Sequence, residues 1–317
     1  MSTKMKNLIK EYFIYLVLLL ELIIFSLLSE KFFVLSNFSN ILRQVSFIAI
    51  AAIGEALVLL TGGMDLSVGA QITFVNVIVA YLMVKCSVSP LAACLMGIAL
   101  TTIIGFLTGL LITMTKMPPM ITTLAMMNIL QGIAYIISEG RSIYGFPETF
   151  AMVGQGKIAG IIPVPVIIMV ICLVLAWILL NKTFVGRYFF AIGGNENAAD
   201  LSGINVTMYK KIVYTISGFF AGLAGILLLS RLNSGTPLTG AGYEMDIVTA
   251  VVLGGVSISG GRGKVSNIVS GVLIIGVLEN GFVLINVGEY PQMVVKGIIL
   301  ILAVAFDCIQ KNRVSKK

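Results

Sequence analysis

LVLLTGGMDLSVGAQ, residues 57–71, is the stretch where a long apolar run meets two adjacent glycines, an acid and a serine. The apolar runs on its two sides cover about residues 41–60 and 66–84. Each is close to the ~20 residues that a helix needs to cross the ~30 Å hydrocarbon core of a bilayer. The stretch therefore predicts two membrane-spanning helices with a glycine-broken segment between them.

The rest of the chain follows the same pattern. Of its 317 residues, 58% are hydrophobic and 11% are charged, whereas a soluble chain carries ~25% charged residues. Candidate spans cover residues 12–29, 41–60, 66–84, 88–114, 119–138, 158–181, 211–230, 245–260, 264–286 and 291–309. The longest loop, about 182–211, is too short to be a domain. We expect an all-α polytopic membrane protein of about ten transmembrane helices, with residues 1–317 forming one transmembrane domain.

The basic residues predict the orientation. With the N-terminus in the cytoplasm and ten spans, the inner segments are the two tails and residues 61–65, 115–118, 182–211 and 261–264. These segments hold 14 of the 21 basic residues, as the positive-inside rule requires. Two acids, Asp65 and Asp307, are also assigned to these inner segments. The 14 are Lys4, Lys6, Lys10, Lys116, Lys182, Arg187, Lys210, Lys211, Arg262, Lys264, Lys311, Arg313, Lys316 and Lys317. Both termini are therefore expected in the cytoplasm, and the net charge of +7 records membrane orientation rather than a nucleic-acid partner.

Several chemistries are excluded by residue type. The chain has no histidine, and its four cysteines form no CxxC pair, so we expect no metal site, cofactor or catalytic residue. A Walker A phosphate loop reads GxxxxGK[ST]; the closest run, SISGGRGKV at 257–265, lacks its first glycine and has valine after the lysine. If ATP drives this protein, another subunit must hydrolyse it.

A second glycine-broken segment, VVLGGVSISGGRGK at 251–264, has the same pattern as the first: an apolar run is followed by two adjacent glycines, a serine and a further glycine. A shift of 192 residues places Gly62, Gly63, Ser67 and Gly69 on Gly254, Gly255, Ser259 and Gly261. Matching interruptions in two halves indicate an internal repeat whose broken helices line a pathway. The alternative is two ordinary tight turns. Our candidates for the translocation path or its hinges are Gly62, Gly63, Asp65, Ser67, Gly254, Gly255, Ser257 and Ser259.

Ionisable residues within spans are costly, and each is a functional hypothesis. Glu21, Glu55, Glu279 and Lys296 fall in this class, and Glu279 and Lys296 are placed to pair between the last two helices. Glu55 and Lys296 are alternatively near an interface, where a long side chain reaches water. The sequence leaves a transport role for these four residues open.

The segment GRYFFAIGGNENAADLSGINV, residues 186–206, lies on the basic side between two spans. Asn195 is placed as the N-cap of a short helix, Glu196 puts a negative charge in its first turn, and Gly203 ends it. Ala198, Leu201 and Ile204 form a small apolar face. That face either rests on lipid headgroups or docks into a groove of a cytoplasmic partner.

Three motifs together carry a resemblance to a family: LTGGMDLSVGA (60–70), the segment 186–206, and GYEMDIVTAVVLGGVSISGGRGK (242–264). In this order and spacing, the chain resembles the permease subunits of ABC importers for monosaccharides, most closely those that carry ribose. The resemblance implies a multi-pass protein of the bacterial inner membrane and a homodimer of permease chains. It also implies cytoplasmic ABC ATPase subunits and an extracytoplasmic sugar-binding protein.

The resemblance further implies that the short helix couples the permease to the ATPase. The residues assigned to this coupling helix are Asn195, Glu196, Ala198, Ala199, Leu201, Ser202 and Gly203. The family pattern is departed from where Asn197 follows Glu196, and at Glu279, where an uncharged polar residue is expected. A competing hypothesis is a proton-coupled secondary sugar transporter that uses Glu21, Glu55 or Glu279, and a third is a channel.

Overall fold

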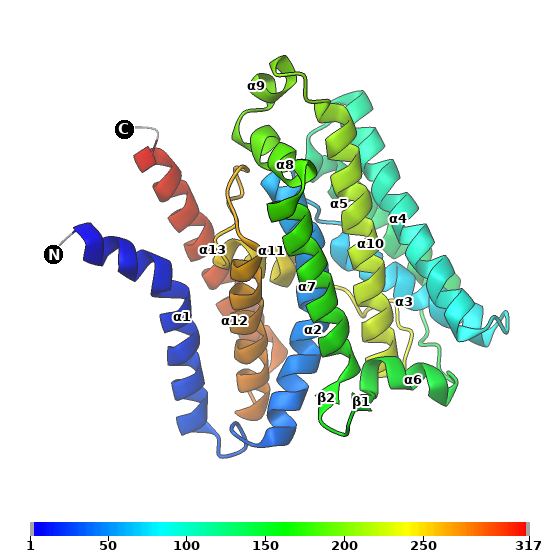
Figure 1. The fold of residues 1–317 in the computed structure, drawn as a ribbon. Coiled ribbons are helices and arrows are strands. Elements are labelled where there is room, and N and C mark those ends of the chain that lie inside the picture. Colours follow the sequence, from blue (N-terminus) through cyan, green and yellow to red (C-terminus); the bar gives the residue numbers. More distant parts are fainter. Residues whose placement is uncertain (1–2, 315–317) are drawn as a thin grey trace.

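The computed structural model describes residues 3–314, with side chains from residue 14 to residue 309 (Figure 1). Its helices are α1 (Thr3–Leu28), α2 (Leu35–Leu60), α3 (Val68–Val84), α4 (Pro90–Thr115), α5 (Pro119–Ser138), α6 (Glu148–Gln155), α7 (Val164–Lys182), α8 (Phe184–Gly194), α9 (Glu196–Leu201), α10 (Val206–Leu232), α11 (Tyr243–Leu253), α12 (Val265–Leu284) and α13 (Glu289–Val314). Strands β1 (Lys157–Ile158) and β2 (Ile162–Pro163) form a small antiparallel hairpin between α6 and α7. The basic residues Lys316 and Lys317 lie outside the described residues.

Within the described residues 3–314, seven helices are long and apolar enough to cross a membrane: α2, α4, α5, α7, α10, α12 and α13. Two shorter apolar helices, residues 14–28 of α1 and all of α3, do not reach that length. The prediction of an all-α polytopic membrane protein is thereby confirmed in its general form.

Two predicted spans have different bounds. The span predicted at 158–181 begins six residues later, because residues 157–163 form the hairpin and Pro165 lies in the first turn of α7, where proline is well tolerated. The span predicted at 245–260 is helical only to Leu253. Gly255, with φ +82°, ends this helix in the left-handed conformation that favours glycine.

The core forms around α2 and α10. Residues 45–60 of α2 are buried without a break, and α10 packs against α2, α3 and α4. Small residues let α4 and α10 approach closely: a Cβ added to Gly109 of α4 would lie 2.9 Å from the Cα of Lys211. Gly218 of α10 has even less room, since a Cβ there would lie 2.2 Å from the backbone oxygen of Thr101 of α4. The glycines of these two helices therefore serve helix packing.

The bundle has two distinct ends (Figure 1). The end at which α8 lies and beyond which α9 projects is called the α9 end. The opposite end, which carries α6, β1 and β2, is called the hairpin end. Helices α4, α5, α7 and α13 keep much of their apolar surface exposed, as expected where a helix faces lipid or another subunit.

Candidate functional site

The short helix α9 forms where the sequence predicts it. The side chain of Asn195 accepts a hydrogen bond from the backbone N–H of Ala198 at 3.0 Å, which is N-cap geometry. The helix ends at Leu201, with Ser202 as its C-cap and Gly203 at φ +85° directly after it. The predicted start and stop are therefore confirmed.

The two faces of α9 differ from the predicted arrangement. Ala199 is buried in a small cluster with Ile192 of α8 and Val206 of α10, and Ile204 packs against this cluster. Leu201, by contrast, is 90% exposed, and Ala198 beside it is also exposed. Ile204 thus holds α9 to the bundle rather than extending its free apolar face.

An ion pair also fixes α9. Lys210 of α10 lies 2.6 Å from a carboxylate oxygen of Glu196, although Glu196 is about half exposed. Such pairs contribute roughly 0–1 kcal/mol. The pair therefore orients α9 on α10 more than it stabilises the fold.

The two glycine-broken segments end their helices in the same way. After α2, the N–H of Gly62 bonds to the C=O of Leu59 and that of Gly63 to the C=O of Val58; after α11, Gly255 bonds to Val252 and Val256 to Val251. Gly62 and Gly255 both have positive φ, +78° and +82°. The equivalent positions are thus 193 residues apart, and the predicted shift of 192 was wrong by one. The error arises because Gly62 and Gly63 follow the last residue of α2 by two and three positions, whereas Gly254 and Gly255 follow the last residue of α11 by one and two.

Asp65 is the centre of a buried polar cluster. Its carboxylate accepts hydrogen bonds from the hydroxyls of Ser67 at 2.5 Å and Ser217 at 2.9 Å, and from the amide of Gln71 at 3.4 Å. Glu55 lies beside it and accepts a bond of 3.3 Å from the backbone N–H of Asp65. All five side chains are buried. Counting Asp65 as a loop charge was therefore wrong, and the Glu55 side chain is enclosed by protein rather than reaching water.

The second segment uses an acid from another helix. The hydroxyl of Ser257 donates to Asp307 of α13 at 3.0 Å, and the backbone N–H of Ile258 donates to the same carboxylate. The backbone N–H of Ser259 lies 3.3 Å from the Ser257 hydroxyl oxygen. Asp307 therefore binds the broken segment as Asp65 binds the first one, and it is not simply a loop charge.

Both broken segments meet the end of α8 at one point, which we call the glycine junction (Gly62, Gly193, Gly260 and Gly261). The N–H of Gly261 donates to the C=O of Leu60 at 2.9 Å. A Cβ on Gly260 would lie 2.9 Å from the Cα of Gly193 and 3.0 Å from the nitrogen of Gly62. Backbones this close leave no room for side chains. A shift of the backbone at the end of α8 would therefore displace both segments.

A second charged cluster ties α2, α11, α12 and α13 together. Lys296 pairs with Asp246 at 2.8 Å and with Glu279, and Gln44 donates to the other oxygen of Glu279. The predicted pairing of Glu279 with Lys296 is confirmed. Glu21 lies apart on α1, where its Oε2 atom is buried without a hydrogen-bond partner in the described part of the chain.

Sequence reasoning missed Gln71, Ser217 and Asp246 as partners in these clusters. Gln71 carried a usable signal, because it is a polar residue within an apolar helix. Ser217 carried none, since serines are common in membrane helices and its contact with Asp65 spans 152 positions.

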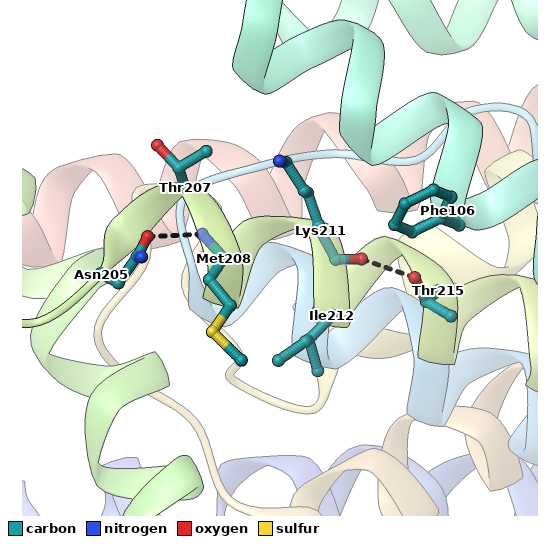
Figure 2. A pocket seen from close by; sticks show the side chains of 7 residues that line it. All are labelled: Phe106, Asn205, Thr207, Met208, Lys211, Ile212 and Thr215. Carbon is teal, nitrogen blue, oxygen red and sulfur yellow. Dashed lines mark hydrogen bonds between the residues drawn. The ribbon is translucent and has the colours of Figure 1, made fainter.

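The start of α10 forms one wall of a hollow of about 340 Å³ (Figure 2). Lys211 brings a charge to this hollow. Its lining residues are Phe106 of α4 and Asn205, Thr207, Met208, Lys211, Ile212 and Thr215. Asn205 caps α10 there by accepting from the N–H of Met208 at 2.9 Å. Within the described residues, no group of three or more His, Cys, Asp or Glu side chains is arranged to hold a metal ion.

The amino-acid sequence is similar to those of several known proteins. The chain is 45% identical to the ribose import permease protein RbsC of Bacillus subtilis, over 92% of this chain and 91% of that protein. It is 43% identical to RbsC of Escherichia coli K12 over the same shares, and 40% identical to the L-arabinose transport system permease protein AraH of that strain, over 86% and 82%. No solved structure is significantly similar. Residues 37–304 match the family described as branched-chain amino acid transport system / permease component, and the chain belongs to this family of membrane permeases.

Proposed function

We propose that this chain is the transmembrane permease subunit of an ABC importer, that it carries a monosaccharide across the bacterial inner membrane, and that ribose is its substrate. The identity to two ribose import permeases over nine-tenths of the chain supports this assignment, and the similarity to an L-arabinose permease supports the wider class. The chain is a transport subunit and not an enzyme. ATP hydrolysis belongs to a separate cytoplasmic subunit, and an extracytoplasmic binding protein delivers the sugar.

The observation that carries the proposal is α9 and its attachment. The coupling helix (Asn195, Glu196, Ala198, Ala199, Leu201, Ser202 and Gly203) offers an exposed leucine to a partner while Ala199 anchors it to the bundle. A fully exposed leucine gains ~1.5–3 kcal/mol when a partner buries it. In this proposal the ATPase binds the exposed face of α9, and the loop about 182–211 is the coupling loop.

The translocation path and its hinges are assigned to the two broken segments. Gly62, Gly63, Asp65 and Ser67 form the first, and Gly254, Gly255, Ser257 and Ser259 the second. Their support is the shared cap geometry and the glycine junction, because a push on α9 acts on both segments at once. A permease that alternates between two states needs such a bistable element, biased by the ATPase.

Ten membrane crossings are the topology we assign. The seven long helices, α1, α3, and α11 with the extended segment after it account for them. The even number puts both termini on the α9 side, which is the cytoplasmic side because most basic loop residues lie there. A second copy of the chain completes the permease as a homodimer.

The proposal is tested in vesicles that contain the permease, its ATPase and its binding protein. Ribose uptake is expected to require ATP and to continue when an ionophore removes the proton gradient. Uptake driven by a proton gradient without ATP would instead support the secondary transporter, and flux without either would support a channel.

A further inference from the structure

A row of polar side chains lies on an exposed face of α5, half-way along a helix that is apolar enough to span a membrane. Asn128 is exposed, Gln131 is half-buried and Tyr135 is 41% exposed. Their spacing of three and four residues places them on one face of the helix. Asn128 lies nine residues after the first residue of α5 and ten before its last, so this face is far from both ends.

Opposite this face lies non-helical backbone. Residues 236–242 run beside α3, where the N–H of Thr236 donates to Asn76 at 3.1 Å and that of Gly240 to Thr73 at 3.0 Å. Gln131 of α5 donates to the carbonyl of Pro237 at 2.5 Å. Since Thr73 and Gln131 both lie within helices, the segment enters the bundle well inside its ends.

The two features enclose a hollow of about 270 Å³. Its lining residues are Met127, Asn128, Gln131 and Tyr135 of α5, Leu238, Gly240, Ala241 and Gly242 of the irregular segment, and Ala70 and Glu244. We call it the α5 hollow. It is open on one side, where Leu238 is 65% exposed and Gly242 is exposed.

This open side cannot face lipid hydrocarbon. Irregular backbone at membrane depth is tolerated only where protein buries it or where it lines a water-filled cavity. Polar side chains within spans obey the same rule. The exposed amide of Asn128 and the exposed backbone near Gly242 therefore face water or another protein surface. Because no described residue covers them, they are assigned to an aqueous path, and the labelling of Asn128→Cys below distinguishes this from a contact with a second copy.

The lining also has the chemistry of a neutral polyol site. The amides of Asn128 and Gln131 both donate and accept, the carboxylate of Glu244 accepts, and the ring of Tyr135 offers a flat apolar face to the C–H side of a sugar. No lysine or arginine is among the described residues that line the hollow, so a phosphorylated sugar finds no partner there.

We infer that Asn128, Gln131, Tyr135 and Glu244 contact the hydroxyl groups and ring of the unphosphorylated monosaccharide as it passes through the membrane. This inference rests on the proposed function and adds the residues that meet the sugar. It places the sugar at the α5 hollow, beside the first broken segment, whose Ala70 lines the same space.

The first test measures uptake by the whole importer in vesicles. Asn128→Ala and Glu244→Gln are each expected to lower the maximal rate of ribose uptake about tenfold, the effect of one lost hydrogen bond in the rate-limiting state. ATP hydrolysis stimulated by the binding protein is expected to stay unchanged. The matched control is Asn181→Ala, because Asn181 bonds to the carbonyl four residues before it in α7 as Asn128 does in α5. It should transport at the wild-type rate.

The second test asks whether the hollow holds water. In a chain whose four cysteines are replaced by serine, Asn128→Cys is expected to react with a water-soluble maleimide and to be protected by ribose. Ile129→Cys is the control, since Ile129 is the next residue, is 54% exposed and lies on the apolar side of α5. It should stay unlabelled.

Wild-type uptake by Asn128→Ala and Glu244→Gln, or an unreactive Asn128→Cys, would overturn the inference and leave the proposed function standing. A wild-type importer that takes up no ribose with ATP would instead contradict the proposed function.

Discussion

At the scale of single residues, Asp65 and Glu55 are two buried acids with different importance to the fold. Asp65 accepts from Ser67, Ser217 and Gln71, and so joins the first broken segment to α3 and α10. Glu55 accepts only the N–H of Asp65 among the described hydrogen bonds. Because a buried donor that loses its acceptor costs ~1–3 kcal/mol, the two acids should respond very differently to substitution.

Asp65→Ala is therefore expected to destabilise the chain by about 3 kcal/mol or more, since four donors lose their acceptor: the three side chains and the backbone N–H of Ser67. Glu55→Gln keeps an oxygen where Asp65 N–H donates and should cost less than about 1 kcal/mol. Thermal unfolding in detergent measures both variants. Equal loss of stability in the two would contradict the central place of Asp65. Transport by Glu55→Gln would also argue against Glu55 as a proton carrier.

At the scale of elements, the helices that are read most easily from the sequence are those whose signals are local. The cap at Asn195 and the stop at Gly203 define α9, and both depend on residues within a few positions. The predicted span at 245–260 ran past the end of α11 at Leu253, although the glycine pair 254–255 was identified as an interruption, because the sequence does not show that Gly255 takes a positive φ and ends the helix there. The hairpin before α7 was missed because its isoleucines resemble the start of a span.

The candidate site divides in the same way. The glycine pairs were visible in the sequence, and so was the pairing of Glu279 with Lys296. The register of the repeat was not, because it depends on where each helix ends. The glycine junction could not be predicted at all, since it joins positions near 62, 193 and 261 through tertiary packing.

The glycine junction predicts a specific sensitivity. Gly261→Ala and Gly140→Ala both place a side chain at nearly equal positive φ, +72° and +70°, a strain of about 1–2 kcal/mol. Only Gly261 is crowded, by Gly193 and Gly194, whereas a Cβ on Gly140 meets nothing within 4 Å. Gly261→Ala should therefore uncouple ATP hydrolysis from uptake, and Gly140→Ala should transport normally. Equal transport by the two variants would remove the junction from the mechanism.

The charged cluster at Lys296 joins four helices, and it gives a second prediction at this scale. Lys296→Met leaves Asp246 and Glu279 without their cation and should destabilise the chain by about 3–5 kcal/mol. Lys210→Met removes the more exposed pair with Glu196 and should cost no more than about 1 kcal/mol. Unfolding in detergent compares them, and similar midpoints would show that the cluster adds nothing to the packing of α11, α12 and α13.

At the scale of the whole molecule, α9, the glycine junction and the α5 hollow are connected through the two broken segments. Helix α9 projects from one end (Figure 1). The glycine junction lies where α8 meets both broken segments, and the α5 hollow lies beside the first of these segments. A partner that moves α9 is therefore expected to drive the passage of sugar. Leu201 is the best residue at which to test this expectation, since its side chain is 90% exposed and is not part of the buried core.

The most direct measurement is ATP-dependent ribose uptake by the reconstituted importer with Leu201→Asp, compared with Leu201→Met. The aspartate variant should insert normally, fail to retain the ATPase and lose uptake, because a charge replaces the apolar contact; the methionine variant should keep both. Wild-type uptake by Leu201→Asp would contradict the account.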